Sequence, residues 1–153
     1  MSRRLQWIIG AVGIVFLMQL LPAPAVEAPP PHEWRHKDFI RQVKPPAELA
    51  ALIRAACYDC HSYEGRLPWY AHLQPGKYWV RKHIHEGREE LNFSLWSDYS
   101  SRRRRNKLNS IVSQIKDRSM PPAYYTPLHP EARLTSFERQ RLIRYFESLM
   151  SQP

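Results

Sequence analysis

The sequence predicts an all-α fold that follows an N-terminal apolar helix. Four segments repeat apolar residues every three to four positions, as amphipathic helices do. No long run alternates apolar with polar residues, as a half-buried strand would. With 153 residues, 43% of them hydrophobic, the chain is long enough for one domain and too apolar for general disorder.

Residues 1–25 have the features of a signal peptide or signal anchor. Arg3 and Arg4 precede the uncharged apolar run Leu5–Leu21, which is long for a cleaved signal and just long enough to span a bilayer. Residues 23–25 (Ala-Pro-Ala) resemble a cleavage site, so the cleaved and anchored forms both remain open. Because the two arginines should stay in the cytoplasm, we expect the rest of the chain on the periplasmic side of a bacterial inner membrane, or in the periplasm after cleavage.

Residues 26–45 are expected to form a proline-rich spacer, and residues 46–150 the folded domain. The segment Pro22–Pro31 contains little besides proline and alanine, which predicts an extended linker. The first helix is expected over about Pro46–Cys60, because two prolines mark its start. Its apolar face comprises Leu49, Leu52, Ile53 and Ala56.

Three further helices are expected over about Lys77–Glu90, Arg103–Arg118 and Thr135–Met150. Loops that contain prolines separate them. The last helix begins with a capping box, in which Thr135 is followed by Glu138 three positions later. The apolar faces of the three helices comprise Trp79, Val80, His83 and Ile84; Leu108, Ile111, Val112 and Ile115; and Phe137, Leu142, Tyr145, Phe146 and Leu149.

The net charge of +9 suits a nucleic acid, a membrane surface or an acidic protein as partner. Export argues against nucleic acid, which leaves the membrane and an acidic redox protein. Arginines at Arg102–Arg105 would oppose the helix dipole in a first turn. We therefore expect them in a solvated loop, with the third helix starting later; the alternative is a docking patch for anionic lipid or an acidic redox partner.

Residues 57–61, Cys-Tyr-Asp-Cys-His, form C-x-x-C-H, the attachment motif of c-type haem. Cys57 and Cys60, three positions apart at a helix end, can add to the two vinyl groups of one porphyrin edge. His61 then lies beneath the iron and supplies the proximal nitrogen. Haem is attached to c-type proteins outside the cytoplasm, so the export segment agrees, and we predict one covalent haem c.

Three other interpretations use the same residues. A dithiol redox motif would need a preceding strand, whereas a helix is expected here. A zinc site could add His83 or His85, although the spacing is irregular. A structural disulfide over so short a loop would add little stability. Two cysteines also exclude a four-cysteine zinc site and a scaffold of several disulfides.

Met120 is the predicted sixth ligand of the iron. It lies in the loop before the last helix and is followed by two prolines, which stiffen the backbone. The other methionines lie in the N-terminal segment or on the last helix. The alternative role for Met120 is core packing, and the rival ligands are His72, His83, His85 and His129.

Residues 56–149 resemble the small haem-binding domain family of bacterial exported proteins. The matching elements are ACYDCHS at 56–62, PWY at 68–70, EGREELNFSLW at 86–96, MPP at 120–122 and LHPEARLTSFE at 128–138. The resemblance implies a cytochrome-c-like helical fold with one covalent haem, held by Cys57, Cys60 and His61, with Met120 in the MPP element. It implies no defined physiological role.

Three functions remain open for such a domain. An electron-transfer module is favoured, because His/Met ligation leaves the iron six-coordinate and no second catalytic group is evident. A peroxidase-like enzyme would need an open iron position and His129 or His83 as acid and base. A haem-based gas or redox sensor would need a weak sixth ligand. Nearby aromatic residues, Trp69, Tyr70, Tyr78 and Trp79, are expected to pack around the macrocycle or to bind its propionates.

Overall fold

The structure is a computed structural model that describes residues 2–30 and 33–151. Residue 1 of the expected export segment and residues 31 and 32 of the expected spacer lie outside the described residues. The described residues form helices, turns and irregular chain without a strand, which confirms the all-α prediction. The α-helices are α1 (Arg3–Met18), α2 (Phe39–Val43), α3 (Ala47–Ile53), α4 (Asp59–His61), α5 (Gly76–Glu90), α6 (Ser101–Lys116) and α7 (Ser136–Met150). The other helical elements are the 3-10 helices η1 (Arg35–Lys37), η3 (Trp69–His72), η4 (Phe93–Asp98) and η5 (Pro130–Ala132) and the π-helix η2 (Arg54–Tyr58).

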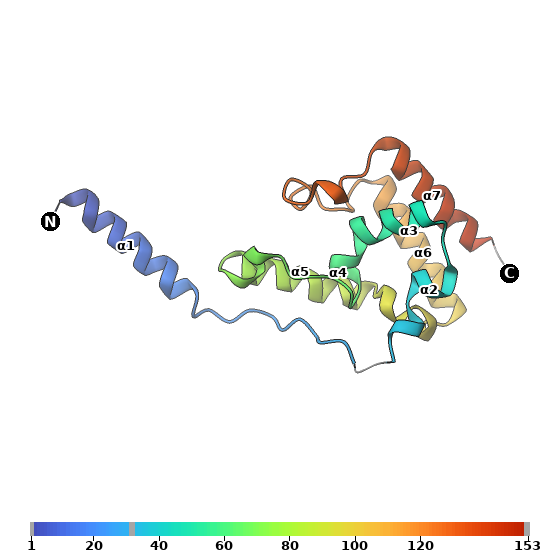
Figure 1. Ribbon diagram of the computed structural model, residues 1–153, viewed down its shortest axis with the longest axis horizontal. Helices are drawn as coiled ribbons and strands as arrows, with labels where there is room; N and C mark the ends of the chain where they lie inside the picture. Colours follow the sequence, from blue (N-terminus) through green and yellow to red (C-terminus); the bar gives the residue numbers. More distant parts are fainter. Residues whose placement is uncertain (1, 31–32, 152–153) are drawn as a thin grey trace.

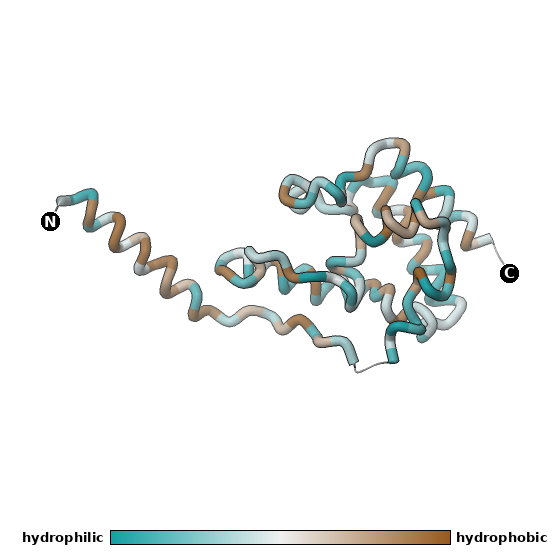
Figure 2. Tube along the Cα trace, viewed as in Figure 1, coloured by the Kyte–Doolittle hydropathy of each residue, from teal (hydrophilic) through white to brown (hydrophobic). Residues whose placement is uncertain are grey.

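Helix α1 lies apart from the folded body and is apolar along most of its length (Figures 1 and 2). It buries no side chain and contains 16 residues. Among the described residues no helix has both the length and the apolar character needed to cross a membrane, so the expected anchor helix is not found. The helix stops short of Leu21 because Pro22 disfavours helical backbone at the residue before it and cannot donate an amide hydrogen bond.

The first predicted helix of the domain is confirmed, with an irregularity at its centre. Elements α3, η2 and α4 follow one another without a break over residues 47–61. Leu49 and Ile53 are buried, as their spacing predicts. The π-helical turn lies over Arg54–Tyr58 and therefore contains Cys57. Turns of this kind frequently occur at functional sites.

The folded region begins further towards the N-terminus than residue 46. Phe39, on α2, is fully buried and packs edge-on against Phe93 and Trp96, with ring centroids 5.2 and 4.9 Å apart. The Asp38 carboxylate caps α2 by accepting hydrogen bonds from the amides of Ile40 and Arg41. Part of the expected spacer is thus core. The helix α2 has five residues, too few for its periodicity to be recognised in the sequence.

Helix α6 begins before the four arginines rather than after them. Ser100 caps the helix, and its side chain accepts a hydrogen bond from the amide of Arg103. The Arg104 guanidinium donates to the carbonyls of Trp96 and Ser97. The expectation of a solvated loop at Arg102–Arg105 is therefore wrong, because the cap and these side-chain hydrogen bonds offset the unfavourable dipole interaction.

Helices α6 and α7 pack side by side and close the core (Figure 1). The capping box of α7 is confirmed, with Thr135 and Glu138 bonded reciprocally. Leu142 and Phe146 are fully buried against α6. Phe137, by contrast, is 64% exposed, because it lies in the first turn of α7, at the edge of the packed interface.

Candidate functional site

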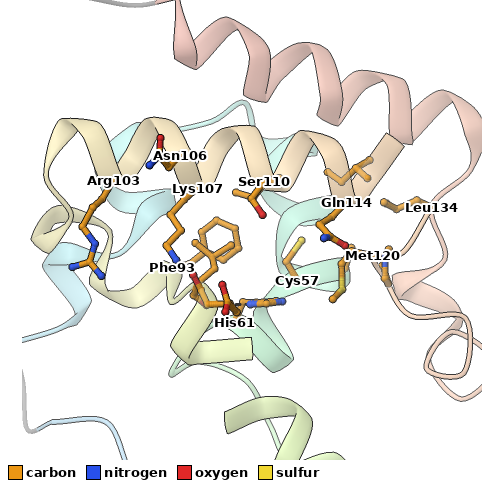
Figure 3. A pocket seen from close by; sticks show the side chains of 16 residues that line it. Cys57, His61, Phe93, Arg103, Asn106, Lys107, Ser110, Gln114, Met120 and Leu134 are labelled. Carbon is orange, nitrogen blue, oxygen red and sulfur yellow. Dashed lines mark hydrogen bonds between the residues drawn. The ribbon is translucent and has the colours of Figure 1, made fainter. Parts of the chain in front are cut away.

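A cavity of about 440 Å³ lies beneath helix α6, and we call it the α6 cavity. Helices α6 and η2–α4 and the loop after α6 enclose it (Figure 3). Its volume falls within the range of about 300–1,000 Å³ that is typical of cofactor pockets. The lining residues are Ala56, Cys57, His61, Glu90, Leu91, Phe93, Arg103, Asn106, Lys107, Ser110, Ile111, Gln114, Ile115, Met120, Pro121 and Leu134.

The orientation of the His61 imidazole is fixed by backbone carbonyls of α5 and its C-cap. Nδ1 of His61 lies 2.8 Å from the Gly87 oxygen and 3.1 Å from the Leu91 oxygen. A carbonyl can only accept, so Nδ1 carries the proton and donates it. Nε2 is then left with a free lone pair. Burial lowers the pKa of His61, so the ring is neutral. This is the state of an imidazole that ligates a metal through Nε2.

Gly87 permits the close approach of α5 to His61. A Cβ at this position would lie 3.1 Å from the Cys60 carbonyl oxygen and 3.3 Å from Cε1 of His61. Both Gly87 and Leu91 belong to the EGREELNFSLW element at 86–96, to which the sequence assigned no chemistry. Their contribution is made by carbonyl oxygens, which leave no side-chain signal in a sequence.

Both cysteines lie beside His61 and are free thiols. Together with Met120 and His83 they line a small cavity of about 10 Å³, the cysteine cavity. Burial raises the pKa of Cys57 to about 12 and that of Cys60 to about 11. A redox dithiol needs a lowered thiol pKa, so the dithiol interpretation loses its chemical basis. The described residues also contain no group of three or more His, Cys, Asp or Glu side chains placed to hold a metal ion, so nothing in them supports the zinc interpretation.

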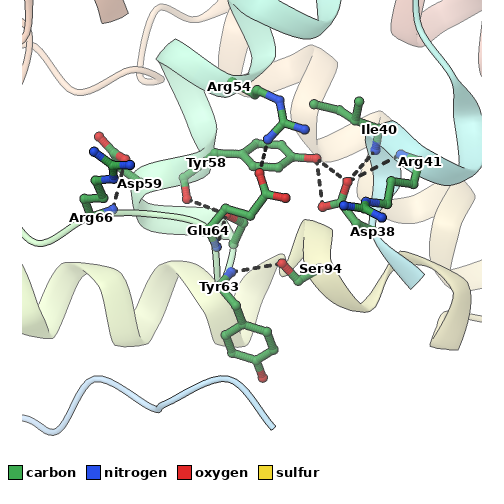
Figure 4. Close-up of polar contacts among 11 residues, drawn as sticks. Asp38, Ile40, Arg41, Arg54, Tyr58, Asp59, Tyr63, Glu64, Arg66 and Ser94 are labelled. Atoms are coloured by element: carbon green, nitrogen blue, oxygen red, sulfur yellow. Dashed lines mark hydrogen bonds and ion pairs between the residues drawn. The ribbon is translucent and has the colours of Figure 1, made fainter. Parts of the chain in front are cut away.

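The two residues between the cysteines tie the motif to the rest of the domain (Figure 4). The hydroxyl of Tyr58 donates to the buried Asp38 carboxylate, with oxygens 3.0 Å apart. Asp59 accepts hydrogen bonds from the hydroxyl of Tyr125 at 2.7 Å and from the amide of Arg66. The helix that bears the thiols is thus held from both sides, and these contacts are not evident from the spacing of the motif.

Met120 is half-buried and lines both the α6 cavity and the cysteine cavity. Its amide donates to the Gln114 carbonyl at 3.2 Å, and its own carbonyl accepts from the Arg139 guanidinium at 3.2 Å. Arg139 also donates to the Ile115 carbonyl at 2.8 Å. The loop at Met120 is therefore attached to both α6 and α7, and the thioether shares the cavity with His61 and Cys57 (Figure 3).

Of the rival histidines, His83 lines the cysteine cavity together with His61. Its Nδ1 atom lies 3.1 Å from the Tyr124 hydroxyl oxygen.

The other three rival histidines have partners elsewhere or lie exposed. His129 is stacked on Tyr125 with ring centroids 4.0 Å apart and is hydrogen-bonded to Tyr70. His85 pairs with Glu89 on the surface of α5. His72 is exposed and lines neither the α6 cavity nor the cysteine cavity.

A second cavity, of about 520 Å³, lies on the Cys60 side of the motif, and we call it the α5 cavity. Its lining residues are Asp59, Cys60, Arg66, Pro68, Tyr70, Gly76, Trp79, Val80, Lys82, His83, Ile84, Glu86, Tyr124 and Tyr125. Trp69 and Trp79 are 74% and 66% exposed, so they are not packed into a core.

The donor set fits an iron porphyrin. Cys57, His61 and Met120 line the largely apolar α6 cavity, and Cys60 joins them in the cysteine cavity. Both cysteines are neutral thiols, and the imidazole has a free Nε2. Apolar walls favour a macrocycle, and imidazole with thioether is one of the ligand pairs of haem iron.

Comparison with known proteins agrees with this chemistry. The sequence profile of the family described as "Haem-binding domain" matches residues 13–148. No curated protein and no solved structure matches the chain significantly.

Proposed function

The chain belongs to the haem-binding domain family, and from that premise we propose that it carries one covalent haem c and transfers electrons outside the cytoplasm. The observation on which this proposal depends is the free Nε2 of His61, held beside two neutral thiols and the Met120 thioether. The α6 cavity supplies the apolar walls. A cytochrome-c-like arrangement of helices around the macrocycle is part of the same proposal.

Cys57 and Cys60 attach the group. Each thiol adds across one vinyl group: the sulfur bonds to one vinyl carbon, and the thiol hydrogen passes to the other. No oxidant or reductant is needed for this addition. The raised pKa values of both cysteines keep their hydrogens in place before the reaction. The ties of Tyr58 and Asp59 to Asp38 and Tyr125 hold the two sulfurs in one place.

His61 and Met120 would provide the protein ligands of the iron. The carbonyls of Gly87 and Leu91 accept the Nδ1 proton of His61, which orients Nε2 and makes it more basic. Hydrogen bonds of its backbone hold Met120 in the wall of the two cavities that His61 also lines. When bound, haem supplies a one-electron couple, and a His/Met ligand pair raises its potential.

Export of the chain is part of the proposal. Arg3, Arg4 and the exposed apolar helix α1 support a role of residues 1–25 as an export signal. The domain would then act in the periplasm. The net charge of +9 favours an acidic redox protein as electron donor or acceptor and a location close to anionic lipid.

The test is production of the wild-type chain in a host that attaches haem c, followed by mass spectrometry and a pyridine haemochrome spectrum. We expect one haem per chain, retained after denaturation, and its loss in the Cys57→Ser/Cys60→Ser variant. A far-red thioether–iron band should be present in the wild type, absent in Met120→Ala and unchanged in the control Met150→Ala. A colourless wild-type protein with two free thiols would contradict the proposal.

The position of His83 supports a second candidate function. Because its imidazole lines the cysteine cavity, it could serve as a ligand or as the distal acid and base of a peroxidase-like site. In that case the ferric protein would lack the thioether band, and Met120→Ala would leave the spectrum unchanged. His83→Ala would change it or abolish peroxide turnover. Ready formation of a carbon monoxide complex without peroxide turnover would indicate a sensor instead.

A further inference from the structure

The side chains that line the α6 cavity change from cationic at one end to apolar at the other. Arg103, Asn106 and Lys107 line one end of the cavity, and Ile115 and Met120 line the other. Figure 3 shows Arg103 and Lys107 on the same face of α6, with Met120 and Cys57 further along the cavity. From Arg103 to Ile115 the helix rises by roughly 18 Å, at about 1.5 Å per residue. A ligand along this cavity therefore meets cations at one end and apolar side chains at the other.

The two cations are positioned by their neighbours without being neutralised. The Lys107 ammonium donates to the Glu90 carbonyl and lies 6.0 Å from the Tyr99 ring centroid. The Arg103 guanidinium lies 5.5 Å from the centroid of the same ring. In the described part of the chain, neither cation forms an ion pair with a carboxylate. The acidic side chain at this end is that of Glu90, which is exposed, so the cavity mouth keeps a net positive charge.

We propose that Arg103 and Lys107 bind the two propionate groups of the haem. This inference rests on the proposed function and adds the orientation of the group. The vinyl edge of a porphyrin must lie at Cys57 and Cys60, and the two carboxylates lie on the side of the ring away from the vinyl edge. Asn106, between the two cations on α6, adds a neutral amide donor at the same end.

Two other arginines and four aromatic residues near the motif do not line the α6 cavity. Arg66 lines the α5 cavity and not the α6 cavity. Arg88 donates to the Glu27 carbonyl at 2.8 Å and lies over the Tyr63 ring. Trp69, Tyr70, Tyr78 and Trp79 are absent from the lining of the α6 cavity. The arginine run, for which the sequence predicts a loop or a docking patch, therefore divides by face. Arg102, Arg103 and Arg105 are all exposed, but of these three Arg103 lines the α6 cavity and the other two do not.

The test compares ferric protohaem with its dimethyl ester, in which both propionates are esterified. The probe is added to the full-length apoprotein, produced in a host that does not attach haem, and binding is followed by the Soret absorbance. The cavity-face variant is Arg103→Gln/Lys107→Gln. The control, Arg102→Gln/Arg105→Gln, removes the same charge from the same helix on another face.

We expect the wild type to bind protohaem about tenfold more tightly than the ester, since two partly exposed charge contacts together correspond to roughly one decade in affinity. The cavity-face variant should lose this preference through weaker protohaem binding, while its affinity for the ester stays unchanged. The control variant should keep the preference. Arg103→Lys/Lys107→Arg should restore most of it.

Equal affinity of the wild type for protohaem and ester would overturn the inference, and this comparison does not depend on any variant folding. An equal loss of preference in the control variant would overturn it as well, because the effect would then be one of net charge. The proposed function fails separately, when the wild type made in an attachment-competent host carries no thioether-bound haem.

Discussion

Replacement of Gly87 by alanine tests the orientation of His61 directly. Gly87 lies inside α5, and its carbonyl accepts the Nδ1 proton of His61. The added Cβ would lie 3.1 Å from the Cys60 carbonyl oxygen and 3.3 Å from Cε1 of His61. Because the first atom belongs to a backbone and the second to a side chain, the imidazole is the part that moves, by a few tenths of an ångström.

The stability of the apoprotein should change little. Alanine in place of glycine inside a helix stabilises it by about 1 kcal/mol. Overpacking by one methyl group costs about 1–3 kcal/mol. The net result is a loss of roughly 0–2 kcal/mol in the free energy of unfolding, whereas Gly87→Val, with two further methyl groups beside His61, should lose distinctly more.

The midpoint potential and the axial-ligand spectrum of the haem should change more than the stability of the apoprotein does. A displaced imidazole forms a weaker hydrogen bond to the Gly87 carbonyl and becomes a less basic ligand. A less basic ligand stabilises ferric iron less well, and ferrous iron is affected to a smaller extent. The midpoint potential of the haem should therefore rise. A tenfold change in relative affinity corresponds to about 59 mV for one electron.

The assay combines urea unfolding of the apoprotein with redox titration and axial-ligand spectra of the holoprotein. Glu89→Ala, on an exposed part of the same helix, is the control and should change neither the potential nor the spectrum. If Gly87→Ala and Gly87→Val both leave potential and spectrum unchanged, the Gly87 carbonyl does not orient the axial imidazole, and our account of the site is refuted.

Three further predictions concern the scaffold around the site. Burial raises the pKa of Asp38 above its ordinary value near 3.8. The folded state therefore binds the carboxyl proton more tightly than the unfolded state does. This tighter binding stabilises the fold below the ordinary pKa, and the stabilisation is lost as the pH rises through the pKa of the folded state. Asp38→Asn, which keeps an acceptor for the α2 amides, should flatten that part of the stability–pH curve in urea unfolding, and an unchanged slope would contradict the assignment. Gly65→Ala would place a Cβ 2.6 Å from the Asp59 Cα, so we expect a loss of at least about 1–3 kcal/mol in unfolding free energy and a lower yield of attached haem; wild-type yield and stability would show that the turn can move away. Phe146→Ala, at a fully buried position, should cost about 3–5 kcal/mol in thermal or urea unfolding, and a cost below 1 kcal/mol would mean that α7 does not close the core.

Much of the fold could be predicted from local sequence patterns. The capping box at Thr135 and Glu138 and the periodicity of α5, α6 and α7 depend on residues within one or two turns of each other, and the structure contains these helices. Helix α6 began earlier than expected, because Arg104 finds acceptors in Trp96 and Ser97. Those partners are local in sequence, but the turn that brings their carbonyls to the guanidinium has no simple signature.

The sequence by itself determined the residue chemistry of the site: two thiols and an imidazole at fixed spacing, and a thioether before two prolines. Only the tertiary structure decided what surrounds them, because those partners are backbone carbonyls or side chains far along the chain. Gly87 and Leu91 orient His61 from 26 and 30 positions away. Phe39 is buried in the core although it lies in a segment for which the sequence predicts a linker. Contacts of this kind arise when helices pack, and a one-dimensional pattern does not record which faces meet.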